Sequence, residues 1–156
     1  MDKSKLKTYG LSILLAEAVG AVSGFITSSG MQQYAAAEKP ALSPPAILFP
    51  IVWTVLYALM GIGSARIYLA PESRNRTVSL VLYGVQLVVN FFWSLIFFGF
   101  HAYGFAFFWL LALLGVIIAM TEFFSKVDKT AALLQIPYIL WVGFATYLNF
   151  MVWRLN

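Results

Sequence analysis

The chain has 156 residues, of which 62% are hydrophobic and only 10% are charged. An average soluble domain carries roughly 25% charged residues, so this composition excludes a soluble or disordered chain and indicates one membrane domain. With no cysteine and a single histidine, His101, the sequence excludes disulfides, thiolate metal sites and sites built from several histidines. We interpret the net charge of +4 as basic membrane-flanking loops, not as a nucleic-acid surface.

Long charge-poor stretches predict the membrane-spanning helices. A helix needs about 20 apolar residues to cross the bilayer, and the positions of the charges leave room for five. Gly99 and Gly104 are expected to make a tight turn between the third and fourth helices. The fold class is therefore all-α and integral to the membrane: a five-transmembrane-helix bundle forming one domain over residues 1–156. The predicted spans are about 8–29, 45–67, 78–98, 104–124 and 131–153.

The basic residues predict how the helices are oriented. Cytoplasmic loops of membrane proteins are enriched in lysine and arginine. This rule places the N-terminus in the cytoplasm and the C-terminus outside a multi-pass protein of the cell membrane. The loop over about 30–44 then lies outside, and its prolines, Pro40, Pro44 and Pro45, favour a rigid lid over the bundle. The first set of loops contains Lys3, Lys5, Lys7, Arg66, Arg74, Arg76, Lys126 and Lys129, and the second contains Lys39 and Arg154.

Aromatic and polar residues share one face on each of three predicted spans. They recur at steps of three and four residues, which is the period of a helix. Polar groups are costly inside a bilayer, so these faces should point at protein or at a cavity. The faces consist of Pro50, Trp53, Tyr57, Met60 and Ser64; of Tyr83, Gln86, Asn90, Trp93 and Phe97; and of Pro137, Trp141, Ala145 and Asn149.

Two interpretations of these faces stay open. Tryptophan is common at membrane interfaces, and asparagine and glutamine often join helices by hydrogen bonds. For Gln86, Asn90 and Asn149, helix joining and ligand contact are equally supported. Pro50 and Pro137 are expected to kink their helices and so to widen a cavity.

The first span has a different character. Ala16, Gly20 and Gly24 form a small-residue face, which favours close helix packing. Glu17 lies beside that face and is either a proton or cation site or a carboxyl group kept neutral inside the bundle. His101 is expected in a solvated outer turn, with ligation of a haem-like guest as the alternative.

Ordered motifs in one loop and three helices resemble the TspO/MBR family, the tryptophan-rich sensory and translocator proteins. The loop carries Lys39-Pro40 and Pro44-Pro45, and Trp53 and Tyr57 follow in the second span. Leu42 and Gln33 stand where the family usually has aromatic residues, so the lid is expected to grip a ligand differently. The further matches are Tyr83, Gln86, Asn90, Trp93 and Phe97, and then Pro137-Tyr138, Trp141, Phe144-Ala145-Thr146, Leu148-Asn149 and Val152-Trp153-Arg154.

The resemblance implies a membrane receptor or sensor that binds porphyrins, such as protoporphyrin IX and haem, and drug-like benzodiazepines and isoquinoline carboxamides. It also implies light- and oxygen-dependent porphyrin degradation as a possible activity, with Trp53 and Trp141 as its catalytic residues. No cofactor or metal is required, because the porphyrin is its own photosensitiser. Many members of the family are homodimers.

The residues themselves fit such a guest. Aromatic side chains that line a cavity can stack on a flat porphyrin ring. The Lys39 ammonium could pair with a propionate group of the porphyrin, and the amide of Gln86, Asn90 or Asn149 could orient the ring. A transporter or channel for tetrapyrroles or other small molecules is the alternative function, and a helix-packing scaffold is a third. The strict cholesterol-recognition pattern is absent, because Arg154 follows Tyr147 by one position more than the pattern allows. The predicted ligand-binding residues are Tyr34, Lys39, Pro44, Trp53, Tyr57, Gln86, Asn90, Trp93, Trp141, Ala145 and Asn149.

Overall fold

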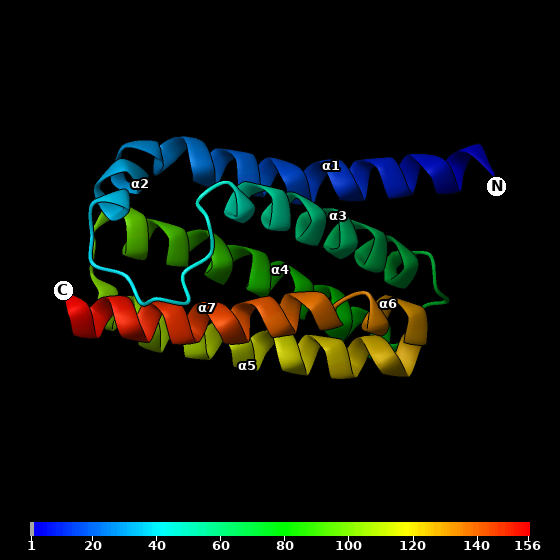
Figure 1. The fold of residues 1–156 in the computed structure, drawn as a ribbon. Helices are drawn as coiled ribbons and strands as arrows, with labels where there is room; N and C mark the ends of the chain where they lie inside the picture. The colour runs from blue at the N-terminus through cyan, green and yellow to red at the C-terminus, as the bar shows by residue number, and fades with distance from the viewer. Residues whose placement is uncertain (1) are drawn as a thin grey trace.

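The structure, a computed structural model, describes residues 2–156 and is a bundle of long helices that run side by side (Figure 1). Within those residues, five helical stretches are long and apolar enough to cross a membrane, which confirms the predicted five-helix fold. The long helices are α1 (Lys3–Ile26), α3 (Leu48–Tyr68), α4 (Arg74–Ser94), α5 (Tyr103–Val127) and α7 (Ile136–Leu155), and the short ones are α2 (Ser28–Ala35), the π-helical turn η1 (Leu95–Gly99) and α6 (Lys129–Leu133).

Polar caps set the helix ends at the end of the bundle where the N-terminus lies. The Ser73 hydroxyl accepts a hydrogen bond from the Arg76 backbone N–H at 3.1 Å, which starts α4. Asp128 starts α6 in the same way, accepting from the Ala131 N–H at 3.2 Å. The Asp128 carboxylate also pairs with Arg66 at 3.0 Å. This pair ties the end of α3 to the corner between α5 and α6.

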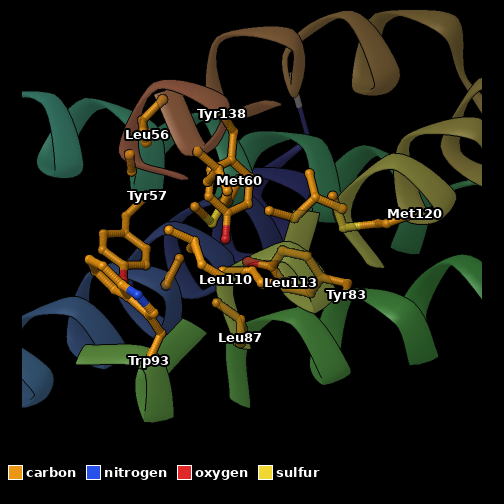
Figure 2. Packing of buried hydrophobic residues seen from close by; sticks show 14 of the residues in the cluster. Leu56, Tyr57, Met60, Tyr83, Leu87, Trp93, Leu110, Leu113, Met120 and Tyr138 are labelled. Atoms are coloured by element: carbon orange, nitrogen blue, oxygen red, sulfur yellow. The ribbon is translucent and has the colours of Figure 1, made fainter. Parts of the chain in front are cut away.

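The helices pack as an open ring. α3 packs on α1, α4 on α5, and α5 on α7. Leu110 and Leu113 of α5 and Met60 of α3 are almost fully buried at the centre, and the Tyr83 and Tyr138 rings point into the same cluster (Figure 2). α3 packs on the short helix α6 and has few close backbone contacts with α7, so the seam between α3 and α7 is the loosest in the ring.

Small residues let α1 and α3 come close, as their spacing predicted. A Cβ atom added to Gly61 would lie 2.5 Å from the Cα atom of Ile13. A Cβ atom on Gly20 would collide with the Tyr57 ring, and Ala16 is fully buried. Gly24, in contrast, faces open space. The packing face therefore ends one helical turn earlier than predicted.

Two local expectations were wrong. The lid loop starts later than residue 30, because α2 continues to Ala35 and the loop spans 36–47. Pro50 does not kink α3, because it lies in the first turn, where its missing N–H has no helical partner to lose. The fifth spanning stretch, Lys129–Leu155, does break where Pro137 predicted a disruption: α6 ends just ahead of it, and Pro137 lies in the first turn of α7.

The turn between the third and fourth spans uses a histidine instead of the predicted glycines. His101 has a φ of 53°, whereas none of the glycines among the described residues has a positive φ. A non-glycine residue in this region is strained unless neighbours hold it. Here the His101 Nδ1 atom lies 3.3 Å from the Tyr103 hydroxyl, and the ring is only half-buried.

Candidate ligand-binding site between α3 and α7

A hollow of about 450 Å³ lies in the loose seam between α3 and α7. Its size falls within the range of about 300–1,000 Å³ that is typical of small-molecule sites. Ile51 and Leu140 at its rim are 54% and 68% exposed, so it opens on the side of the bundle that faces lipid in a membrane. The resemblance implied a pocket opening beneath the first loop, whereas this hollow opens sideways. Its lining consists of Ile51, Val52, Val55, Leu56, Pro137, Leu140, Trp141 and Phe144.

Trp141 is the polar point of this apolar lining. Its ring is half-buried and lies 5.7 Å from both the Phe49 ring of α3 and the Phe144 ring of its own helix. Its indole Nε1 atom is buried and has no hydrogen-bond partner among residues 2–156. A buried N–H group without a partner costs about 1–3 kcal/mol. The indole N–H is therefore an unsatisfied donor in the wall of the hollow, at an atom that the protein itself covers.

Trp53 lies beside the hollow but does not line it. Its ring centroid is 5.6 Å from that of Tyr57 and 6.2 Å from that of Tyr138 on α7. These contacts close the inner side of the seam with aromatic rings. The structure thus brings Trp53 and Trp141 to the same seam, while only Trp141 contacts the open volume.

The predicted amide residues hold the helices together. Asn90 donates to the Tyr57 hydroxyl at 3.0 Å, which links α4 to α3. Asn149 accepts from the Trp93 indole at 3.1 Å and donates to the Tyr103 carbonyl at 2.8 Å. These bonds match the helix-joining interpretation, because the amide groups are engaged inside the chain. Ligand contact by them stays a prediction.

Gln86 joins the same internal network through Tyr138, which the sequence did not predict as a site residue. The Tyr138 hydroxyl donates to Gln86 Oε1 at 2.7 Å, and both residues are fully buried. Gln86 Nε2 lies 3.8 Å from the Met60 sulfur. Tyr138 was missed because it lies off the face defined by Pro137, Trp141 and Ala145. The sequence signal that could have identified Tyr138 was its position next to Pro137 in the motif of the fifth span.

The lid residues are held by the bundle itself. The Tyr34 ring packs 5.2 Å from that of Phe97 and 5.4 Å from that of Phe98. The Lys39 ammonium donates to the carbonyls of Tyr34 and Ala35 at 3.2 and 3.0 Å. It therefore closes the end of α2, and its contact with a propionate stays a prediction. Burial raises the pKa of the Tyr34 phenol, and the nearby Tyr103 raises it further.

The remaining predicted residues lie at or near these elements. Ala145 is buried one turn beyond Trp141 on α7, and Pro44 is half-buried in the lid loop. Glu17 is half-buried on α1, and its carboxylate has no salt-bridge partner within residues 2–156. In the same described range, no group of three or more metal-ligating side chains lies together. A proton or cation role for Glu17 stays a prediction.

Comparison with known proteins agrees with this fold. Residues 12–154 match the TspO/MBR family. The chain is 40% identical to the Tryptophan-rich protein TspO of Chlorobaculum tepidum, covering 100% of this chain and 99% of the relative. It is 39% identical to Protein CrtK of Rhodobacter capsulatus (91% and 89% covered) and 37% identical to the human Translocator protein (94% and 89% covered). With this match over nearly its whole length and five helices able to span a bilayer, the chain is a multi-pass membrane protein of the TspO/MBR family.

Proposed function

We propose that this protein is a membrane sensor or receptor that binds a flat, apolar, aromatic guest of the porphyrin class in the hollow between α3 and α7. The observation that carries the proposal is the unpartnered Trp141 indole N–H at the edge of an otherwise apolar hollow. A porphyrin brings an apolar disc for the lining and acceptor atoms for the indole. Drug-like carboxamides share both properties, which makes them candidate guests as well.

The surroundings of the hollow suit a ligand that dissolves in lipid. Its rim residues face the bilayer, so a guest reaches it without crossing a polar surface. Trp141 and Phe144 line the hollow with aromatic rings, and stacked aromatic pairs add about 0.5–1.5 kcal/mol beyond the area that they bury. Binding by aromatic stacking plus one hydrogen bond is the mode that this geometry supports.

Titration with protoporphyrin IX tests the proposal, with tryptophan fluorescence as the readout. Trp141→Phe keeps an aromatic ring but removes the N–H donor, so we expect a loss in affinity of about tenfold. Trp109→Phe is the matched control, because the Trp109 indole is occupied by the Val89 carbonyl at 2.8 Å and lies outside the hollow. Equal affinity in wild type and Trp141→Phe would exclude Trp141 as the polar contact.

A light-driven reaction of the bound guest is a further part of the proposal. A porphyrin that absorbs light in air would lie against Trp141, with Trp53 in the ring layer behind it. Indoles are readily oxidised, so these two residues are the side chains proposed to take part. Illumination of the complex in air should bleach the porphyrin more slowly in the Trp53→Phe/Trp141→Phe variant. Equal bleaching rates would remove both residues from the chemistry.

Packing at the centre of the bundle favours binding over translocation. Leu110, Leu113 and Met60 fill the space between the helices and are at most 1% exposed. Passage of a guest through the bundle would require these side chains to part. Flux of a labelled porphyrin into liposomes that exceeds the protein-free rate would support the translocator alternative instead.

The orientation of the chain belongs to the proposal too. The N-terminus, the α3–α4 connection and the α5–α6 corner lie at one end of the bundle (Figure 1). Eight of the ten basic residues lie in or next to those segments. Such an end faces the cytoplasm in most membrane proteins. Labelling of a single cysteine introduced at Lys3 or at Arg154 from each side of sealed vesicles tests this orientation.

A further inference from the structure

The end of the bundle that holds the N-terminus carries the whole net charge of the protein. Eight of the ten basic residues and four of the six acidic residues lie at this end, in or next to the start of α1, the α3–α4 connection and the α5–α6 corner. The rest of the chain has two residues of each kind, so the net charge of +4 belongs to this end alone. Positive charge that is concentrated in this way attracts anionic groups at one membrane surface.

The basic residues of this end fall into two groups that differ in their balance of charge. The larger group, which we call the basic patch, has five basic residues beside two acidic ones, Asp2 and Glu72. The smaller group lies at the α5–α6 corner and has three basic and two acidic residues. Most of the positive excess therefore belongs to the patch. The patch consists of Lys3, Lys5, Lys7, Arg74 and Arg76, and the corner of Arg66, Glu122, Lys126, Asp128 and Lys129.

The register of α1 against α3 brings the two halves of the patch to the same level. The two helices run in opposite directions (Figure 1), and Gly61 lies against the Ile13 backbone. Counted from that contact, Lys7 is level with the last turn of α3, and Lys3 is level with the connection that leads to Arg74. α1 also packs on α4. The lysines of α1 and the arginines at the start of α4 therefore border one region of the membrane surface.

The length of α1 places this region among the lipid headgroups. A helix of 24 residues is about 36 Å long, whereas the hydrocarbon core of a bilayer is about 30 Å thick. The first turns of α1 therefore extend out of the hydrocarbon. Lys5 and Lys7 are exposed there, and Leu6 between them is 55% exposed. An apolar side chain between two lysines suits a lipid, because a lipid brings acyl chains as well as charge.

The basic side chains of the patch are not neutralised within the chain. Among residues 2–156 the one ion pair joins Arg66 to Asp128 at the corner, so no basic residue of the patch pairs with a carboxylate. Asp2 is engaged in capping α1, because its carboxylate accepts a hydrogen bond from the Ser4 N–H at 3.3 Å. The positive charge of the patch is therefore available to an anionic partner.

Arg76 is held in a fixed position at the edge of the patch. Its Nε and Nη2 atoms donate to the Tyr68 carbonyl at 3.1 and 2.8 Å, and its guanidinium lies 5.2 Å from the centre of the Tyr68 ring. A guanidinium has five N–H groups, so Arg76 keeps donors for a further acceptor such as a phosphate oxygen. The Tyr68 ring is 55% exposed and offers apolar surface beside the charge.

We propose that the basic patch binds the headgroups of anionic phospholipids. The phosphate lies between the lysines of α1 and the arginines of α4, with Leu6 and Tyr68 against the upper part of the acyl chains. Binding depends on the patch itself and not on the net charge of the whole end. It is also separate from the binding of a guest, because no residue that lines the hollow between α3 and α7 belongs to the patch.

Spin-labelled lipids measure this preference in bilayers that contain the full chain. Electron paramagnetic resonance gives the fraction of a labelled lipid that the protein holds, so labelled phosphatidylglycerol and labelled phosphatidylcholine are compared. One basic residue near a membrane surface strengthens the binding of anionic lipid about fivefold. We expect the wild-type chain to prefer phosphatidylglycerol about tenfold. A preference below about twofold would overturn the proposal.

Two double variants that remove the same charge separate the patch from the corner. Lys5→Gln/Lys7→Gln acts on the patch and should lower the preference about fivefold. Lys126→Gln/Lys129→Gln acts on the corner at the same end of the bundle and should change the preference less than about twofold. All four lysines are exposed, so we expect both variants to fold, which circular dichroism checks. An equal loss in the two variants would show that only the net charge of the end matters, and the proposal would fail.

Salt and a soluble competitor identify the bound group. Raising sodium chloride from about 0.1 M to about 1 M shortens the Debye length from about 10 Å to about 3 Å, so the preference should largely disappear. Glycerol 3-phosphate carries the phosphate without the acyl chains, and an excess of it should not release the labelled phosphatidylglycerol. Release by this soluble anion would overturn the assignment to a lipid. A preference that survives the high salt concentration would overturn the electrostatic mode of binding.

Discussion

Gly61 offers a direct test of the close contact between α1 and α3. In Gly61→Ala, the new Cβ atom would lie 2.5 Å from the Ile13 Cα atom and 2.8 Å from its backbone nitrogen. Ordinary contacts begin at 3.4 Å, so the two backbones would have to separate by roughly 0.9 Å. Backbone atoms cannot rotate away as a side chain does. Overpacking of this kind costs about 1–3 kcal/mol, which is the loss of stability that we expect.

Gly84→Ala is the control for this substitution. Gly84 also lies within a helix, but a Cβ atom there meets nothing within 4 Å. Alanine restricts the unfolded chain more than glycine does, so this variant should be neutral or up to about 1 kcal/mol more stable. Unfolding by sodium dodecyl sulfate in mixed micelles, followed by circular dichroism, measures both variants. Equal losses in the two, or no loss in Gly61→Ala, would refute the argument from close backbone contact.

Three further predictions concern the polar contacts. Asn149→Ala leaves the buried Trp93 indole N–H without an acceptor, so the free energy of unfolding should fall by about 1–3 kcal/mol. The affinity for protoporphyrin IX should stay constant. A loss of affinity without a loss of stability would instead favour ligand contact by Asn149. Asp128→Ala removes the cap of α6, so the stability measured by thermal unfolding should fall by about 1–2 kcal/mol. Arg66→Ala breaks only a partly exposed ion pair, so the loss of stability should be less than about 1 kcal/mol. Because burial raises the pKa of Tyr34, its contribution to stability should be constant below pH about 10 and fall above it, and melting curves of Tyr34→Phe should lack that fall.

The sequence predicted the helices well because their signal is local. Charged side chains are costly in the bilayer core, so the long charge-poor stretches locate the five spans to within a few residues of the observed bounds. The small-residue face of α1 was equally readable, since Gly20 has no side chain to keep the Tyr57 ring away. These features depend only on spacing along one helix.

The site was less predictable because it depends on how helices face one another. Helical spacing placed Asn90 and Asn149 on inward faces, but it could not show that Tyr57 and Trp93 would occupy their amides. Trp53 and Trp141 have similar motif contexts, yet only Trp141 lines the hollow. The π-helical turn and the positive φ of His101 also escaped prediction, because both arise from packing at the end of α4.

The uneven packing of α1 has a consequence for the order in which the helices assemble. Only Ala16 and Ser23 of its 24 residues are buried, whereas α3 buries eight residues and α5 buries six. In lipid, helices gain little from hiding apolar surface and associate through close packing. The close packing of α1 is with α3, where Gly61 lies against the Ile13 backbone. We therefore expect α1 and α3, the first two long helices to leave the ribosome, to pair before α4, α5 and α7 complete the bundle.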